Sequence, residues 1–304
     1  MLRKLIIHEF KAVSKFLTLV AIFMIVITLV GAIGSFVILP GYSNTSFEYE
    51  YIVESGDGMS ASVIISPDIG GMFTALYMMV YIAGSFLLTA GSFIYLWMRF
   101  HNSMYGQQGY LTNTLPTTPA KIIIAKLITA TIWVTFSISL MLGSAFTLVQ
   151  AVNAASGKLN TNTYNGPSLF DIFRQYGISI PLIIALYAVF FLSMIVLGVL
   201  MMYGSSAMGQ LAKKHRGFIA IGCYFGMTMI INVITTFIGT IAARAMNRNH
   251  IYFGEVEDDF INQFGYIYER VNWIIFIYLI LIIIGGIILF WLTNYVTSKR
   301  LNLE

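Results

Sequence analysis

Charged residues are scarce in this chain of 304 residues: only 10% are Asp, Glu, Lys or Arg, while 58% are hydrophobic. Globular domains that live in water carry about 25% charged residues, so this composition excludes an ordinary soluble domain. A charged side chain at the centre of a bilayer costs at least about 2.5 kcal/mol. Long apolar runs with few charges therefore mark segments in lipid, and the sequence indicates an integral membrane protein.

Cysteine and catalytic motifs are also scarce. A single cysteine, Cys223, excludes a disulfide within the chain and a cysteine metal site, and we expect a buried packing thiol. The segment HEFKA, residues 8–12, begins like the HExxH zinc motif but has Ala12 where the second histidine ligand is required. There is no GxxxxGK[ST] phosphate loop. We therefore expect a chain that is not an enzyme and that holds no metal or cofactor of its own.

Titratable side chains are missing from the central parts of the apolar runs. A proton- or ion-coupled carrier places such groups near mid-membrane, and an intramembrane protease needs a nucleophile with a base or paired acids. All four histidines lie outside the apolar runs: His8, His101, His215 and His250. Both classes of protein are therefore disfavoured.

Six apolar runs are each long enough to cross about 30 Å of hydrocarbon as a helix. They lie near residues 16–39, 72–98, 122–150, 178–203, 218–243 and 272–296. No loop between them has room for a soluble domain of about 50 residues. The prediction is an all-α membrane protein with a single transmembrane domain, residues 1–304.

The basic residues predict the orientation of the six spans. With the N-terminus inside, the inner segments hold twelve Lys or Arg against two acids, and the outer loops hold five against eleven. An excess of Lys and Arg marks cytosolic loops, so we expect both termini to be cytosolic in a multi-pass protein of the cell membrane. The basic residues form no patch suited to nucleic acid.

Residues 1–15 read as an amphipathic helix on the inner membrane surface. At 100° per residue, one polar stripe collects Lys4, His8, Lys11 and Lys15. Glu9 instead falls in the opposite, apolar arc, where a lone carboxylate would be desolvated. We expect Glu9 to pair with Arg99 or another cation of the adjoining segment; the alternative is that it reaches water at the edge of the helix.

The outer loops carry local structure signals. Residues 40–71 contain alternating aromatic and β-branched residues around Ser55-Gly56-Asp57-Gly58, which predicts a small extracellular β-hairpin. In the loop 151–177, Ser168 and Asp171 have the spacing of a helix-capping pair. The loop 244–272 predicts one or two short extracellular helices at the membrane interface before Trp273.

The segment between the second and third spans has an unusual composition. From Phe100 to Ala120 it contains no charged residue, although a solvated loop normally carries charge. Gly106 and Gly109 permit a sharp reversal after the second span, and Thr118 with Pro119 predicts the start of the third. An uncharged loop with exposed apolar groups, which we expect from Met104 onward, is typical of a docking site for a cytosolic protein.

Within this segment, GYLTNTLP resembles the EGYL-x-x-TLP pattern in permease subunits of bacterial ABC-2 type exporters (type V fold). The matching residues are Gly109, Tyr110, Leu111, Thr114, Leu115 and Pro116, and Gln108 stands where the family commonly has an acid. The resemblance extends weakly to residues 8–16 and 207–218. It implies a coupling helix between spans two and three that contacts an ATPase through Tyr105, Gln107, Gln108, Gly109, Tyr110, Leu111, Thr114, Leu115 and Pro116. It also implies that the N-terminal helix packs beside this region, where Glu9 and Arg99 would pair.

The resemblance further implies the partners and the activity. Two copies of a separate cytosolic ATPase would bind ATP and Mg²⁺, and the permease would pair with a second copy or with a homologous permease. A bundle without fixed charge suits an amphipathic or hydrophobic cargo, with a secreted antimicrobial or toxin peptide considered first and a drug second. Two alternatives remain open: an ATP-independent channel or lipid scramblase, and a membrane-anchored sensor or assembly factor.

Overall fold

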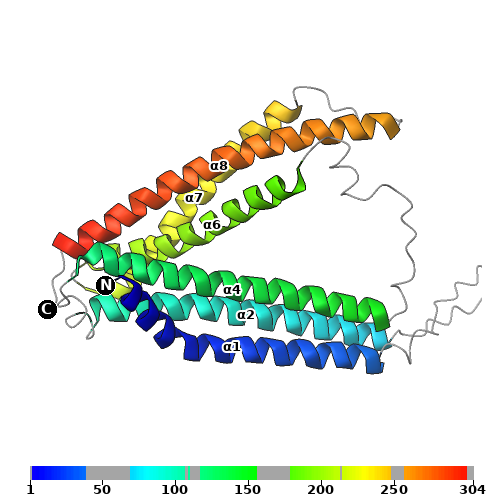
Figure 1. Cartoon of the computed structure of the whole chain (residues 1–304), viewed down its shortest axis with the longest axis horizontal. Helices are drawn as coiled ribbons and strands as arrows, with labels where there is room; N and C mark the ends of the chain where they lie inside the picture. Colours follow the sequence, from blue (N-terminus) through cyan, green and yellow to red (C-terminus); the bar gives the residue numbers. More distant parts are fainter. Residues whose placement is uncertain are drawn as a thin grey trace, which may run out of the picture. The chain divides into compact units, whose positions relative to one another are not determined.

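A computed structural model describes residues 2–38, 69–106, 109, 117–155, 179–212, 214–247 and 257–299. The described residues form helices and no strand (Figure 1). The helices are α1 (Leu2–Ile38), α2 (Ile69–Tyr105), α4 (Pro119–Ala155), α6 (Ile180–Gly209), α7 (Arg216–Asn247) and α8 (Glu257–Lys299). The expected all-α architecture is therefore confirmed for this part of the chain, whereas the expected β-hairpin and the capping pair Ser168 and Asp171 lie outside it.

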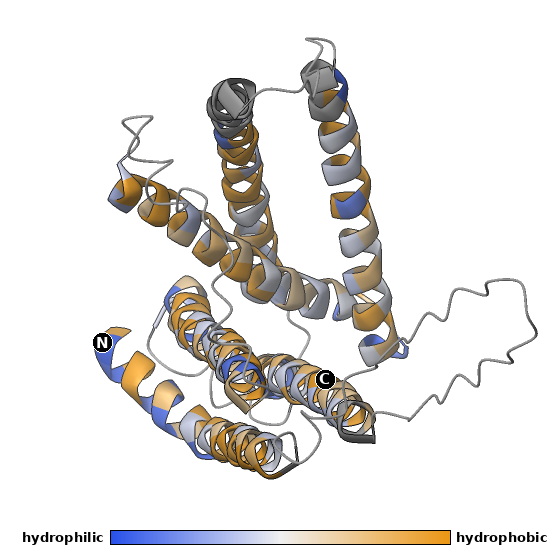
Figure 2. Ribbon diagram, turned by 90° about the vertical axis from the view of Figure 1, so that its right-hand side faces the viewer, coloured by the Kyte–Doolittle hydropathy of each residue, from blue (hydrophilic) through white to orange (hydrophobic). Residues whose placement is uncertain are grey.

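All six helices are long and apolar enough to cross a membrane. They contain 30 to 43 residues, so even the shortest extends about 45 Å, more than the roughly 30 Å of a hydrocarbon core. Orange, hydrophobic segments recur along the helices in Figure 2, between paler ones. Many of their side chains are exposed, including Phe218 at 80% and Val37 at 75%. Such exposed apolar surfaces are suited to contact with lipid and identify a multi-pass membrane protein.

The helix ends differ from the predicted span ends. The expected surface segment 1–15 and the first span belong to one continuous helix, α1. In the second span, α2 continues past the predicted end at residue 98 to Tyr105. Backbone hydrogen bonding continues wherever the chain allows it, so the helices pass beyond the apolar runs that the hydropathy pattern delimits.

One expected feature of the last outer loop is wrong in the described residues. Residues 257–272 do not form a separate short helix before Trp273, because α8 begins at Glu257 and continues without interruption to Lys299. Residues 257–270 therefore extend the last helix beyond its candidate membrane span, Val271–Ser298. Residues 248–256 lie outside the described part of the chain.

The chain divides into two compact units. Unit 1 comprises Met1–Ser14, Phe93–Thr135 and Gly166–Glu304, and unit 2 comprises Lys15–Ser92 and Phe136–Asn165. Unit 1 thus contains the first residues of α1, the end of α2, the start of α4 and all of α6, α7 and α8. Its apolar core is formed by α6, α7 and α8 around Leu197, Met201 and Ile282.

In unit 2, two tyrosines of α2 form hydrogen bonds with α1 and α4. The Tyr77 hydroxyl donates a 2.6 Å hydrogen bond to the carbonyl of Ile27 on α1, and its ring lies against Gly31, where a Cβ would overlap it. The buried Tyr81 hydroxyl is hydrogen-bonded to Ser144 on α4. Glycine at 31 therefore allows α1 and α2 to approach closely.

The close contact between α6 and α7 in unit 1 gives the first testable prediction. A Cβ at Gly209 would lie 2.7 Å from both the Ala220 Cβ and the Arg216 carbonyl oxygen, whereas a Cβ at Gly198 would meet nothing within 4 Å. We expect Gly209→Ala to destabilise the protein by about 1–3 kcal/mol, because backbone on α7 must move. Gly198→Ala is the matched control and should be neutral or stabilising. Equal thermal unfolding midpoints for the two variants in detergent would contradict this packing.

Candidate functional site

Three charged residues from three helices meet in unit 1, and we call Glu9, Arg99 and Lys126 the charge cluster. A carboxylate oxygen of Glu9 on α1 lies 2.5 Å from the Lys126 Nζ on α4. The other oxygen lies 3.5 Å from an Arg99 guanidinium nitrogen on α2. The side chains of Lys126 and Glu9 are only 5% and 14% exposed. Both ionic groups are thus largely removed from solvent and depend on each other for compensation.

The position of Glu9 on α1 explains the cluster. Glu9 lies in the apolar arc of the helix, the same arc that packs against the protein: Val13, one turn later, is 2% exposed, and the Phe10 ring stacks on Trp133 of α4 at 5.0 Å. The structure thus brings together the predicted partners Glu9 and Arg99. Lys126 makes the shorter contact, although the sequence had named only Arg99 or another cation of the adjoining segment as the partner.

An aromatic cluster of Phe100, Tyr105 and Tyr203 lies beside these charges. The rings of Phe100 and Tyr203 are stacked, with centroids 3.7 Å apart, and Tyr105 contacts Phe100 edge-on. The Tyr203 hydroxyl donates a 3.2 Å hydrogen bond to the backbone carbonyl of Lys126. Tyr203 on α6 therefore joins the end of α2 to the start of α4.

A second polar contact links α2 to α6. The Trp97 Nε1–H donates a 2.6 Å hydrogen bond to the Ser206 hydroxyl, which is fully buried, and the indole lies 5.7 Å from the Tyr224 ring on α7. Sequence reasoning missed Trp97 and Tyr203 as parts of a site. Ser205 and Ser206 are both completely buried, as small residues at helix contacts commonly are. The only available signal was the concentration of aromatic residues in WMRFHNSMY.

The last residues of α2 are packed inward. Met104 is 0% exposed, so the prediction that the coupling segment exposes its apolar groups from Met104 onward is wrong at this residue. The Tyr105 hydroxyl lies 3.0 Å from the Thr297 hydroxyl of α8. Because Thr297 donates its own hydrogen to the Thr293 carbonyl, Tyr105 is the donor. Tyr105 is therefore a contact within the chain, which the residue pattern did not reveal.

A turn follows α2 directly. The Gly106 N–H donates to the Asn102 carbonyl at 3.1 Å, and the Gly106 carbonyl accepts from the Gly109 N–H at 2.8 Å. A Cβ at Gly106 would lie 2.7 Å from the Asn102 oxygen, so only glycine fits without displacement. The chain enters α4 at Pro119, as predicted, with the Lys121 N–H bonded to the Thr118 carbonyl.

Most residues predicted to contact an ATPase lie outside the described part of the chain. Only Tyr105 and Gly109 of that set are described, and Gly109 is buried. The others are Gln107, Gln108, Tyr110, Leu111, Thr114, Leu115 and Pro116. Their role stays a prediction. What the structure adds is the anchoring of the chain on both sides of them, by the end of α2 and the start of α4.

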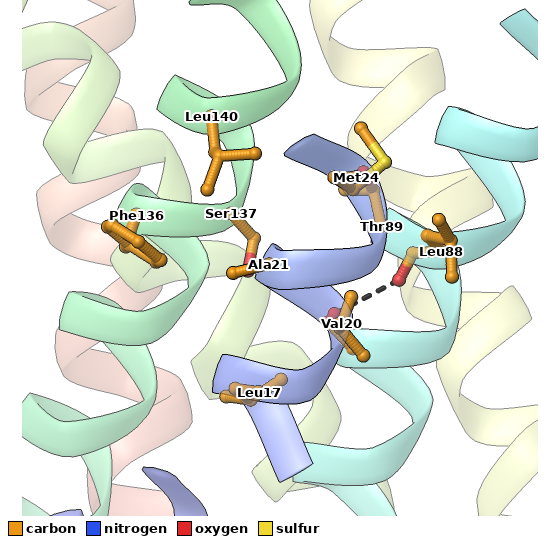
Figure 3. A pocket seen from close by; sticks show the side chains of 10 residues that line it. Leu17, Val20, Ala21, Met24, Leu88, Thr89, Phe136, Ser137 and Leu140 are labelled. Atoms are coloured by element: carbon orange, nitrogen blue, oxygen red, sulfur yellow. Dashed lines mark hydrogen bonds between the residues drawn. The ribbon is translucent and has the colours of Figure 1, made fainter. Parts of the chain in front are cut away.

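Small cavities occur in both units. In unit 2, a cavity of about 10 Å³ lies among residues of α1, α2 and α4, with Leu17, Met24, Leu88 and Phe136 in its wall (Figure 3). This volume corresponds to about one water-sized group. In unit 1, a cavity of about 20 Å³ adjoins the charge cluster. Among the described residues, no group of three His, Cys, Asp or Glu side chains could hold a metal ion.

Comparisons with protein-family models, with curated proteins and with solved structures give no match to this chain. Function is therefore inferred from the residues and contacts described above. In unit 1 these contacts connect the ends of α2 and α4 with three other helices, namely α1 through Glu9, α6 through Tyr203 and α8 through Thr297.

Proposed function

We propose that this chain is the permease subunit of an ATP-driven exporter of the ABC-2 type. In this proposal both termini are cytosolic, and the segment between α2 and α4 docks on a separate ATPase that is present in two copies. A second copy of the chain, or a homologous permease, completes the pathway in the cytoplasmic membrane. The cargo is an amphipathic or hydrophobic compound, such as a peptide toxin, an antimicrobial peptide or a drug.

The observation that carries the proposal is the anchoring of the proposed docking segment. Residues 107–116 follow an α2 end whose Met104 is fully buried and whose Tyr105 is hydrogen-bonded to α8. They precede an α4 start that is held to α1 by the Lys126–Glu9 contact. A segment with such rigid ends transmits a push to several helices at once, because packed interfaces move as bodies.

The contacts in unit 1 indicate which helices would move. Phe100 stacks on Tyr203 of α6, and Trp97 is bonded to Ser206 of the same helix. Displacement of the α2 end by a closing ATPase would therefore shift α6, and with it α7 and α8, which share its apolar core. A ligand changes such an equilibrium only by binding one state better than the other. In the proposed cycle, ATP supplies that difference through the partner subunit.

The distribution of titratable groups supports an external energy source. Each of the six helices contains a continuous stretch of more than 20 residues without Asp, Glu, Lys, Arg or His. The clustered cations of unit 1, Arg99 and Lys126, are only six or seven residues from a helix end. A relay of protons through the middle of the membrane has no groups to use in these stretches.

Transport should accordingly depend on ATP and not on the proton gradient. The experiment uses inside-out vesicles that contain the chain together with its ATPase subunit, with ATP outside and two test cargos, a labelled hydrophobic peptide and a cationic dye. We expect uptake to persist after a protonophore is added and to stop when the catalytic glutamate of the ATPase is replaced. Uptake that collapses with the proton gradient while ATP remains, or that occurs without the ATPase, would overturn the proposal.

A further inference from the structure

The cavity beside the charge cluster has the features of a binding site. It has a volume of about 20 Å³, and a water-sized group needs about 10–15 Å³. Its polar wall is formed by Glu9, Arg99, Lys126, Thr129 and Tyr203. Thr129 uses its hydroxyl hydrogen on the Ala125 carbonyl, and Tyr203 donates to the Lys126 carbonyl. The charged groups of its wall are therefore Glu9, Arg99 and Lys126.

The charges around the cavity do not balance. Two cationic side chains face one carboxylate, and the remaining described residues of the wall are neutral. The guanidinium of Arg99 cannot lose its proton in a protein. Lys126 makes the short, charge-assisted contact with one Glu9 oxygen, and Arg99 makes only the longer one with the other oxygen. The cluster therefore carries one net positive charge, and Arg99, whose side chain is 30% exposed, is only partly compensated by the 3.5 Å contact with Glu9.

An unused hydrogen-bond donor lies at the same place. The Arg99 Nε is buried and has no hydrogen-bond partner among the described residues. Its guanidinium approaches Glu9 only at 3.5 Å, a distance that is long for a hydrogen bond between nitrogen and oxygen. The excess charge and the unused donor thus belong to one residue. An anionic oxygen beside Arg99 would compensate the charge and accept a hydrogen bond from the unused donor.

We propose that this cavity binds one oxygen of a phosphate group, supplied by the headgroup of an anionic phospholipid. The cavity admits a single oxygen, and the rest of the phosphate stays outside beside Arg99, whose side chain is 30% exposed and marks the mouth. Arginine suits this role because its planar donors match phosphate oxygens.

The depth of the site favours a lipid over a free ion. A 37-residue helix such as α2 or α4 is about 55 Å long, so about 12 Å at each end extends beyond a roughly 30 Å hydrocarbon core if the helix is centred. Arg99 lies six residues before the end of α2, and Lys126 lies seven residues after the start of α4, or about 9–10 Å from those ends. This is the depth of lipid headgroups. Ile7, on the same turn of α1 as Glu9, is 55% exposed and offers a contact for an acyl chain.

The test measures lipid retention without any transport assay, so its outcome is independent of the exporter proposal. Purified protein in detergent is mixed with phosphatidylglycerol or phosphatidylcholine, and bound lipid is counted by native mass spectrometry. We expect the wild type to prefer phosphatidylglycerol and Arg99→Gln to lose about tenfold or more of that affinity, as for a charge-assisted hydrogen bond. Lys121→Gln removes an equal charge from an exposed position of α4 and should keep the preference.

A second variant separates binding from folding. Ala130 is 2% exposed and lines the cavity, so Ala130→Val fills part of the space while all three charges stay in place. We expect it to lose phosphatidylglycerol as Arg99→Gln does. A parallel experiment measures thermal stabilisation by inorganic phosphate. If phosphate stabilises the protein in an Arg99-dependent way while no lipid is preferred, the anion site is supported but the lipid is overturned as the source of the phosphate. Wild-type affinity for phosphatidylglycerol in both variants would overturn the site itself.

Discussion

Glu9→Ala should destabilise the protein by about 3–5 kcal/mol, the cost of breaking a buried ion pair by removing one partner. The change leaves the Lys126 ammonium and the Arg99 guanidinium facing each other, with the Lys126 side chain only 5% exposed. The measurement is the free energy of unfolding in detergent from a denaturant titration. Lys11→Ala, at an exposed position two residues further along α1, is the matched control and should stay within about 0.5 kcal/mol of the wild type.

A double variant tests the origin of that loss. If repulsion between unpaired cations causes it, Glu9→Ala combined with Lys126→Met should be more stable than Glu9→Ala alone, because the most buried charge is removed as well. Additive effects of the two changes would mean that the residues do not interact. Such additivity would contradict the 2.5 Å contact between them.

Tyr110→Asp together with Leu111→Asp should abolish ATP-driven transport while leaving the chain folded. In the proposed function these residues belong to the apolar surface that enters the ATPase, and loss of two anchors worth about 2 kcal/mol each weakens binding at least a hundredfold. The measurement is the dissociation constant of the purified permease and ATPase, taken with the unfolding midpoint of the permease. Tyr110→Phe with Leu111→Met keeps the apolar surface and should bind normally.

A further control places the same chemical change elsewhere. Leu211, between α6 and α7, is 52% exposed, and Leu211→Asp adds an acid to another connection on the side predicted to be cytosolic. We expect it to retain the ATPase. If the Tyr110 and Leu111 double variant also retains a stoichiometric ATPase, the segment is not the docking site.

The two sets of variants report on different parts of one region. The charge cluster belongs to the described part of unit 1, and we expect its variants to change stability and lipid retention. The segment 107–116 connects α2 to α4, and its effect is expected on a partner. A Glu9 variant that stays folded but loses ATP-driven transport would show that the charge cluster and the segment 107–116 are functionally coupled. The reason is that the cluster holds the helix ends to which the segment is attached.

The sequence alone determined the number and approximate position of the six membrane-spanning helices. A charge or an unpaired backbone group in lipid costs free energy whatever its tertiary neighbours are. The apolar runs can therefore be identified from the sequence alone, without knowledge of tertiary contacts. The start of α4 at Pro119 was predictable for a similar reason, because proline at the first helical position is a local preference. Glu9 could be singled out as misplaced because helical periodicity is also local.

Only the tertiary structure decided what these residues contact. The choice of Lys126 as the closest partner of Glu9 depends on two residues separated by 117 positions, and the inward packing of Met104 and Tyr105 depends on α8. Apolar side chains serve equally well against lipid and against another helix, so hydropathy distinguishes membrane from water but not the two faces of a span. For that reason the sequence located the helices and suggested the pairing of Glu9 with Arg99, whereas the role of Lys126 and the cavity were found only once the helices were packed.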